Sequence, residues 1–486
     1  MKFYIKNISL ALVTVIAVSC THEFPPVDEP DAGSADFTKM VSVGNSLTSG
    51  FLDNALYQSG QDASFPAIIA LQMEAVGGGQ FNAPDVGLEI PDGRLVLAQN
   101  VSANPNASPV PTPAGTAGLP APFNATQGNP TAYTGDKSAL NNFGVPGMSL
   151  GMSLATIASY PPGTEGTAAL FGRFAADPAT STQIGDAAAA LADGGTFFTF
   201  WLGNIDVLGY ATGGASNPAL LTSDGDFNTF LGLALGALTT ANSNAKGAVA
   251  NIPNVPDVAY FTTISWNPVP LDQASADALN ANYAAYNAGI SASPLSAEEK
   301  ALRTINFVVG NNGFVIEDDL LTDLTAGGLP NYRQTQLGDL VILPAAAQLP
   351  TGLGTLAGPA ADQWVLTGVT YPNGSVSEVA EVANSIAAFN GHIKTAVDAN
   401  PNLVLVDVNA EFASLAANGV SINGSGMNAT LQPPFGGFSL DGVHPNKRGY
   451  AYIANLFISA INAEFGSQIP LCNPNDYAGN NLPIPY

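Results

Sequence analysis

The chain has 486 residues and a formal net charge of −25, from 38 acidic and 13 basic side chains. This charge repels a phosphate backbone, which argues against nucleic acid as a partner. Hydrophobic residues make up 46% of the chain and charged residues only 10%, so a large core can form beneath a surface of mostly uncharged polar groups.

The first twenty residues have the pattern of an export signal. "MKFYIKN" carries two lysines, "ISLALVTVIAV" is an apolar run too short to span a bilayer, and "SC" follows. This order resembles a bacterial lipoprotein signal, which implies cleavage after residue 19 and lipidation of Cys20. We therefore expect a protein of the bacterial cell envelope, held on a membrane by its lipid. A plain secretory signal with a chance cysteine is the alternative.

Residues 20–36 are rich in Pro, Asp and Glu and predict a flexible tether. From residue 37, short apolar runs alternate with stretches of helical periodicity. Strands are predicted at 37–44, 196–203, 245–252, 257–264 and 402–408. Helices are predicted at 64–76, 223–241, 274–290, 375–399 and 445–465. Such alternation favours an α/β domain over 37–466, with a central parallel sheet covered by helices on both faces.

Two segments interrupt this alternation and are predicted to be insertions, at about 76–135 and 295–375. The first is rich in Gly, Pro, Asn and Ala, and the second holds short strand-like pieces between turns. Residues 467–486 are expected to be a C-terminal tail. Cys472 lies in it and, with Cys20 lipidated, has no cysteine left to pair with.

Polar residues follow the predicted strands where a parallel sheet forms its sites. Ser46 comes just after the first strand in "VGNSL", and the late segment "DGVHPNKRGY" holds Asp441 and His444. Pro445 disfavours helical geometry at His444 and is itself suited to begin the final helix. Asp441 can then orient the imidazole, as hydrolytic triads require. We predict Ser46 as nucleophile, His444 as base and Asp441 as the residue that orients it.

The ordered blocks "GNSL", "NNFGVPGMS" at 141–149, "GNID" at 203–206 and "DGVHPN" at 441–446 resemble those of SGNH (GDSL-type) serine hydrolases. The resemblance implies a three-layer α/β/α flavodoxin-like fold and ester hydrolysis through an acyl-enzyme. It also implies an oxyanion hole made by the amides of Ser46 and Gly147 and by an asparagine side chain.

Two positions depart from the family's blocks. Asn45 stands where an aspartate is usual and keeps its turn-forming ability. Ile205 stands where the family has the oxyanion asparagine, directly before the aspartate, and Asn204 lies one residue earlier. Either a local backbone adjustment lets Asn204 serve, or one donor is missing, at a cost of roughly 10²–10³ in turnover.

Other interpretations compete with this one. "GMSLG" at 147–151 matches a nucleophile elbow, which would make Ser149 the nucleophile. The elbow needs a strong preceding strand, and "SALNNFGVP" is predicted to be a poor one. "DGVHPN" taken alone is typical of a helix-entry turn. A surface lipoprotein of this fold that binds glycan or ester ligands without turnover is the alternative function.

The expected substrate is a small-molecule, lipid or acetylated-glycan ester, and the sequence does not choose among them. No cofactor is expected, and no Cys/His cluster has the spacing of a zinc site. The remaining histidines, His22 in the tether and His392 in a helix, are not expected to be catalytic.

Overall fold

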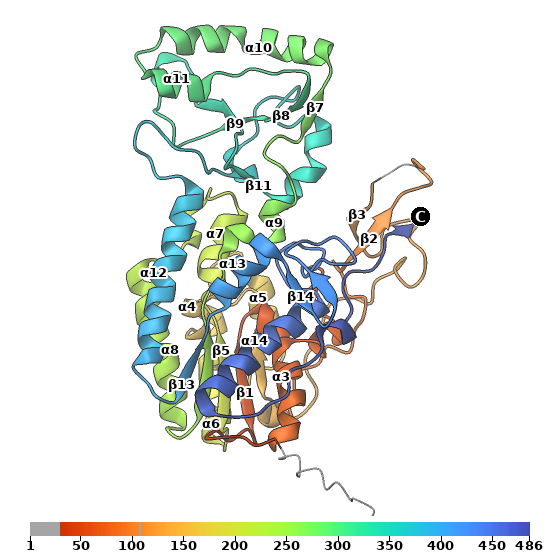
Figure 1. The fold of residues 1–486 in the computed structure, drawn as a ribbon, viewed down its shortest axis with the longest axis vertical. Helices are drawn as coiled ribbons and strands as arrows, with labels where there is room; N and C mark the ends of the chain where they lie inside the picture. Colours follow the sequence, from red (N-terminus) through yellow and green to blue (C-terminus); the bar gives the residue numbers. More distant parts are fainter. Residues whose placement is uncertain (1–29, 106–107) are drawn as a thin grey trace, which may run out of the picture.

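The computed structural model describes residues 30–105 and 108–486, and its centre is a five-stranded parallel sheet (Figure 1). The strands, in spatial order, are β13 (Leu403–Val406), β6 (Lys246–Ala250), β5 (Phe197–Trp201), β1 (Met40–Gly44) and β4 (Asn142–Gly144). All neighbouring strands pair in parallel. The chain moves from β1 outward to β4 and then returns past β1 to β5, so the order of strands reverses between β1 and β5.

Helices cover both faces of this sheet because its side chains are apolar on both. In β5, Phe198 and Phe200 belong to one buried cluster, whereas Phe197 and Trp201 belong to the other. The first face is covered by α6 (Gln183–Ala192), α8 (Asp224–Ala241) and α12 (Glu378–Asp398). The second is covered by α3 (Phe65–Met73) and α14 (Lys447–Phe465). The predicted α/β class, with a parallel sheet between two layers of helices, is confirmed.

Further helices connect these elements. They are α1 (Ser46–Ser49), α2 (Gln58–Gln61), α4 (Leu150–Ser153), α5 (Glu165–Gly172), α7 (Ile205–Thr212), α9 (Ala259–Thr262) and α13 (Val408–Asn418), and a hairpin of β14 (Val420–Ile422) and β15 (Ser425–Met427) follows α13.

Two sequence predictions about strands are wrong. The segment 257–264 was expected to be a strand because it is rich in Val, Tyr, Phe and Thr, yet it forms α9. The sheet passes from β6 directly to β13, which leaves this segment no edge to pair with. Conversely, "NNFG" looked too weak for a strand, but β4 pairs with β1 and is buried throughout.

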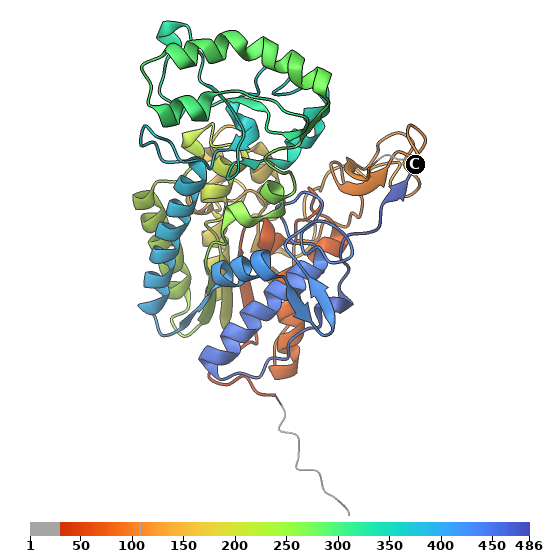
Figure 2. The same ribbon diagram turned by 45° about the horizontal axis from the view of Figure 1, so that its top comes forward.

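A second unit is inserted between α9 and α12 and lies beyond one end of the sheet (Figures 1 and 2). It contains α10 (Gln273–Ala292), α11 (Ala297–Arg303) and three antiparallel pairs, formed by β7 (Val269–Leu271) with β8 (Gly310–Asn312), β9 (Val315–Glu317) with β10 (Tyr332–Gln334), and β11 (Leu340–Val341) with β12 (Val365–Leu366). The unit therefore begins before residue 295. The helix expected at 274–290 is α10, and it packs on the unit's own core rather than on the central sheet.

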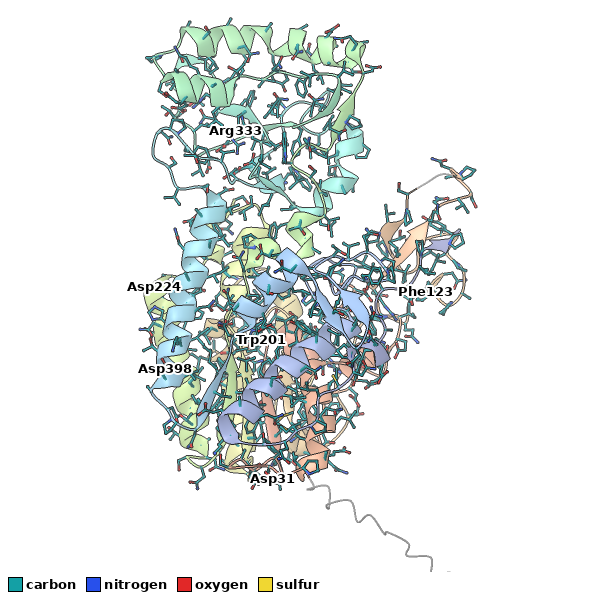
Figure 3. The ribbon with its side chains drawn as sticks, viewed as in Figure 1. Asp31, Phe123, Trp201, Asp224, Arg333 and Asp398 are labelled. Atoms are coloured by element: carbon teal, nitrogen blue, oxygen red, sulfur yellow. The ribbon has the colours of Figure 1, made fainter. Side chains whose placement is uncertain are left out.

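The inserted unit has a charged centre as well as an apolar one. Arg333, labelled in Figure 3, is fully buried and forms ion pairs with Asp318 and Asp339. The hydroxyl of Tyr371 donates a hydrogen bond to Oδ2 of Asp318 at 2.7 Å. Because each charge is paired and hydrogen-bonded, the burial cost of the ions is offset.

The first insertion forms a smaller lobe at the side of the domain, where Phe123 lies (Figure 3). Its strands β2 (Leu95–Gln99) and β3 (Val110–Pro113) form an antiparallel pair, and β16 (Ile484–Pro485) adds to β2 in parallel. Residues 467–486 are therefore not a free tail. Cys472 is 8% exposed, and burial raises the pKa of its thiol to about 11.

The described end of the predicted tether also contacts the domain. The backbone N–H of Ser34 donates to the carbonyl of Phe465, and that of Gln468 donates to the carbonyl of Asp31. A flexible tether over 20–36 is thus wrong for residues 31–34, because these hydrogen bonds fix them at the end of α14. In the part of the chain that the structure describes, no helix combines the length and apolarity needed to cross a membrane.

Candidate active site

Ser46 lies at the first position of α1, directly beyond the carboxyl end of β1. Gly44 ends the strand, and a Cβ there would lie 1.9 Å from Oγ1 of Thr48, so only glycine lets α1 fold so close. The Asn45 side chain caps α1 by accepting a hydrogen bond from the N–H of Leu47 at 3.0 Å. Asn45 therefore performs the turn function that the sequence assigned to it, and Ser46 is held at a helix N-terminus, 4% exposed.

Ser46 and His444 meet, although they are 398 positions apart. Oγ of Ser46 is 2.8 Å from Nε2 of His444, and Nδ1 of His444 is 3.0 Å from Oδ2 of Asp441. The ring of Phe51 contacts the imidazole, with ring centroids 4.9 Å apart. The three predicted side chains thus form one hydrogen-bonded series, hydroxyl to imidazole to carboxylate, which is the geometry of a hydrolytic triad.

The turn that carries His444 is closed by Asp441. Oδ1 of Asp441 accepts hydrogen bonds from the N–H groups of Val443 and His444, each at 2.9 Å. α14 begins only at Lys447, with Asn446 as its cap, so the prediction that Pro445 begins the helix is wrong. The reason is local, because the Asn446 side chain accepts from the N–H of Gly449 and donates to the carbonyl of Gly436.

Asp441 is also held from a distant part of the chain. Its Oδ2 accepts from the N–H of Asn54 at 2.9 Å, in addition to the bond with His444. Burial acts to raise the pKa of Asp441, but attraction to His444 and these hydrogen bonds outweigh it and lower the pKa to about 2. The carboxylate is therefore charged at every pH above about 4.

Sequence analysis missed the segment that supplies this contact. Asp53 and Asn54 both have positive φ, 53° and 60°, a conformation uncommon outside glycine. Oδ1 of Asp53 accepts from the N–H of Leu440 at 3.1 Å, and the N–H of Asp53 donates to Oγ of Ser439. The turn at 53–54 thus docks on the loop that precedes His444. In the sequence, the adjacent polar residues Asp53 and Asn54 inside the mostly apolar stretch "FLDNALY" were the signal that could have identified this turn.

Asn204 shares a pocket with Ser46 and His444. The pocket is otherwise lined mainly by apolar side chains, and its lining comprises Asn45, Ser46, Leu47, Asn204, Ile205, Leu208, Pro253, Val255, Val258, Val443 and His444. Asn204 is 5% exposed, and neither polar atom of its amide has a hydrogen-bond partner among the described residues. A buried amide without a partner is costly, and Asn204 is one of the residues that line the pocket of Ser46.

Gly147 lies at the same edge of the sheet, three residues beyond β4, whose last residue pairs with the last residue of β1. Its φ is +77°, and a Cβ would lie 2.3 Å from Oγ1 of Thr167, so the position requires glycine. Gly147 is not among the residues that line the pocket, and no hydrogen bond joins it to Ser46 in the described part of the chain.

Asp206 links the turn of Asn204 to the segment that follows Gly147. Its Oδ2 accepts from the N–H of Leu150 at 2.8 Å, and its Oδ1 accepts from Oγ1 of Thr222 at 2.8 Å. Burial raises the pKa of Asp206 to about 6. Asp206 therefore connects the "GNID" block at 203–206 to the residue that follows the block at 141–149. No hydrogen bond joins it to the side chains of Ser46, His444 or Asp441 in the described residues.

The rival residues lie in other settings. Ser149 caps α4 by accepting from the N–H of Met152 at 3.3 Å, and it has no histidine partner in the described structure. His392 pairs with Asp224 on the surface, with Nε2 2.8 Å from Oδ1. His22 and Cys20 lie outside the described residues, so the predicted lipidation stays a prediction.

Comparison with models of known protein families, with curated proteins and with solved structures gives no match for this chain.

Proposed function

We propose that the chain is a serine esterase of the SGNH hydrolase family that cleaves carboxylic esters through an acyl-enzyme on Ser46. The observation that carries the proposal is the pair of hydrogen-bond distances, 2.8 Å from Ser46 to His444 and 3.0 Å from His444 to Asp441. These groups converge beyond the carboxyl ends of the strands, where open α/β sheets form their sites.

The order of the strands supports the family assignment. Numbered by position in the chain, the sheet reads 2-1-3-4-5, the doubly wound order of flavodoxin-like folds. In that order the crevice opens between the first and third strands. Ser46 follows the first of these and Asn204 follows the third, so the proposed nucleophile and the pocket amide flank the expected crevice.

The reaction follows from the placement of the three side chains. Oγ of Ser46 attacks the ester carbonyl while Nε2 of His444 takes the hydroxyl proton, and Asp441 stabilises the resulting imidazolium. The proton then passes to the leaving alcohol, and the acyl group stays on Ser46. A water molecule, deprotonated by His444, releases the acid and restores the serine.

The oxyanion that forms in each step needs hydrogen-bond donors. The N–H of Ser46 lies at the start of α1 and, like that of Gly147, donates to no other group in the described residues. Asn204 lines the pocket beside Ser46, and its buried amide has no hydrogen-bond partner in the described residues. We therefore assign Asn204 the role of the asparagine that Ile205 displaces, with Ser46 and Gly147 as the backbone donors.

The pocket suits the acyl part of an ester, because most of its lining side chains are aliphatic. Small-molecule, lipid and acetylated-glycan esters all offer such a group. The proposal further includes a bacterial cell-envelope location through a lipid on Cys20, which rests on the sequence pattern of residues 1–20.

Reaction with a fluorophosphonate tests the proposal directly. We expect the folded chain to react at Oγ of Ser46, with loss of fluoride, because His444 activates that hydroxyl. Intact-mass analysis and peptide mapping would locate the adduct, and heat-denatured protein should not react. A folded chain that stays unlabelled supports the ligand-binding alternative instead.

Asn204→Ala is expected to lower kcat for a nitrophenyl ester by about 10²–10³, since one oxyanion donor is lost. KM should change little, because the ground-state carbonyl needs this donor less than the oxyanion does. Asn217→Ala, which removes an exposed asparagine that caps a neighbouring turn, is the matched control. Unchanged kcat in the Asn204 variant would show that the displaced asparagine has no functional replacement.

A further inference from the structure

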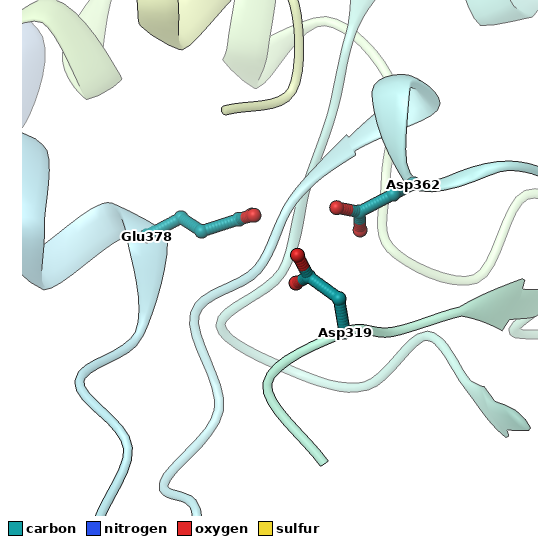
Figure 4. A group of neighbouring side chains, drawn as sticks. All are labelled: Asp319, Asp362 and Glu378. Carbon is teal, nitrogen blue, oxygen red and sulfur yellow. The ribbon is translucent and has the colours of Figure 1, made fainter. Parts of the chain in front are cut away.

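Three carboxylates converge where the inserted unit meets the central domain. Asp319 follows β9, Asp362 begins a short 3₁₀ helix (Asp362–Trp364), and Glu378 is the first residue of α12. Figure 4 shows the three side chains pointing toward one centre. One carboxylate oxygen from each lies within 4.8 Å of the others.

No basic side chain neutralises this group. Among the described residues, none of the three carboxylates forms an ion pair with Lys, Arg or His. The guanidinium of Arg333 acts on Asp362 through its charge without forming an ion pair with it. Arg333 is already paired with Asp318 and, through two nitrogens, with Asp339.

Two buried oxygen atoms beside the cluster also lack partners. Oδ1 of Asp362 is inaccessible to solvent and has no hydrogen-bond partner in the described chain. Thr367 is fully buried, and its Oγ1 forms no well-directed hydrogen bond, although its N–H donates to Oε2 of Glu378 at 2.6 Å. The Thr367 hydroxyl lies close enough to Glu378 to act toward a lower pKa of that carboxyl, so it is beside the cluster. Unpartnered oxygens of this kind are what a hard cation coordinates.

We propose that Asp319, Asp362 and Glu378 bind a hard divalent cation, Ca²⁺ or Mg²⁺, with the Thr367 hydroxyl as a neighbouring oxygen. The donors are oxygens alone, without the imidazole or thiolate ligands that favour zinc or copper. Because Asp319 and Asp362 belong to the inserted unit and Glu378 to α12, the ion joins the two parts of the molecule. The site is separate from the Ser46 pocket and does not depend on the proposed esterase activity.

Protons are the competing means of neutralising the cluster. Burial, and after it repulsion among the carboxylates, raises the pKa of Asp362 to about 8 and that of Glu378 to about 9. A chain that uses protons alone would gain nothing from added cation. The decisive measurement is therefore cation binding at neutral pH rather than stability alone.

Isothermal titration of the chelator-treated full chain with CaCl₂ and MgCl₂ tests the proposal. We expect one ion per chain, with a Kd below about 1 mM for at least one of the two metals, and a Tm that rises by about 2–4 °C at saturation. Asp362→Asn should weaken binding at least about tenfold, since it removes one of three charges. Asp277→Asn, which neutralises an exposed carboxylate on α10 of the same unit, should leave binding and the Tm response unchanged.

Terbium luminescence decides the question without any variant. Trp364 lies in the same short helix as Asp362, so excitation of tryptophan should sensitise a bound Tb³⁺, and Ca²⁺ should displace it at a ratio of one ion per chain. The proposal is overturned if the wild-type chain binds neither metal at about 10 mM. It is equally overturned if Asp362→Asn binds as tightly as Asp277→Asn, which would assign the bound ion to another acidic surface.

Discussion

Ser46→Ala is expected to reduce kcat/KM for a short-chain nitrophenyl ester by about 10⁴–10⁶, because no other hydroxyl lies within reach of Nε2 of His444 in the described structure. The Tm should stay within about 2 °C of the wild-type value, since the substitution removes one small, nearly buried group without breaking a helix cap. Steady-state kinetics together with thermal unfolding separate lost chemistry from lost fold.

Ser149→Ala is the matched control for this variant. Ser149 belongs to the competing "GMSLG" motif and caps α4, so its replacement should cost about 1 kcal/mol of stability and leave the rate intact. The opposite pattern, with full activity in Ser46→Ala and none in Ser149→Ala, would transfer the nucleophile to the elbow motif and end the triad assignment.

Asp441→Asn is expected to lower kcat about 10⁴-fold. An asparagine can still accept hydrogen bonds through Oδ1, but its NH₂ group would then face the N–H of Asn54 and Nδ1 of His444. The imidazole can keep that contact only in the tautomer that presents a proton to Ser46, which is wrong for a base. Activity at neutral pH is the readout.

The pH range over which this difference persists follows from the pKa of Asp441. The folded-state pKa, about 2, is below the ordinary value of 3.8. The stabilisation from the charged form is therefore complete above about pH 4 and is lost as the pH falls through about 2. Asp441 itself therefore does not titrate between about pH 5 and pH 9, so a change in the ratio of the two rates within that range would come from another group.

Asp224→Asn provides a control with the same chemistry at a remote position. Asp224 forms the other aspartate–histidine pair among the described residues, with the partly buried His392 on α12. Neutralising it should leave the rate unchanged. An equal loss of activity in both variants would indicate a general electrostatic effect and contradict a specific role for Asp441.

The sequence was informative where short segments determine the structure. Runs such as "TFFTFW" predict buried strands because every position is apolar or β-branched, and β5 is buried at all its positions. The triad was also predictable, because Ser46 and His444 lie in turns whose caps, Asn45 and Asp441, are local.

What the sequence could not predict depends on contacts between distant segments. β4 is a weak strand by composition and exists because β1 offers it an edge. The start of the inserted unit was misplaced because α10 has ordinary amphipathic spacing, which does not say which core it packs on. Asp319, Asp362 and Glu378 have no common spacing in the chain, so only the fold brings them together.

The packing of α3, near the start of the chain, against α14, near its end, determines when this part of the core can form during synthesis. α14 packs on α3 and covers its face of the sheet, and the hydroxyl of Tyr450 donates to the carbonyl of Phe51. During synthesis from the N-terminus, the apolar face of α3 and of the sheet therefore forms before α14 is available to cover it. We expect a chain that ends before α14 to expose this surface and to aggregate.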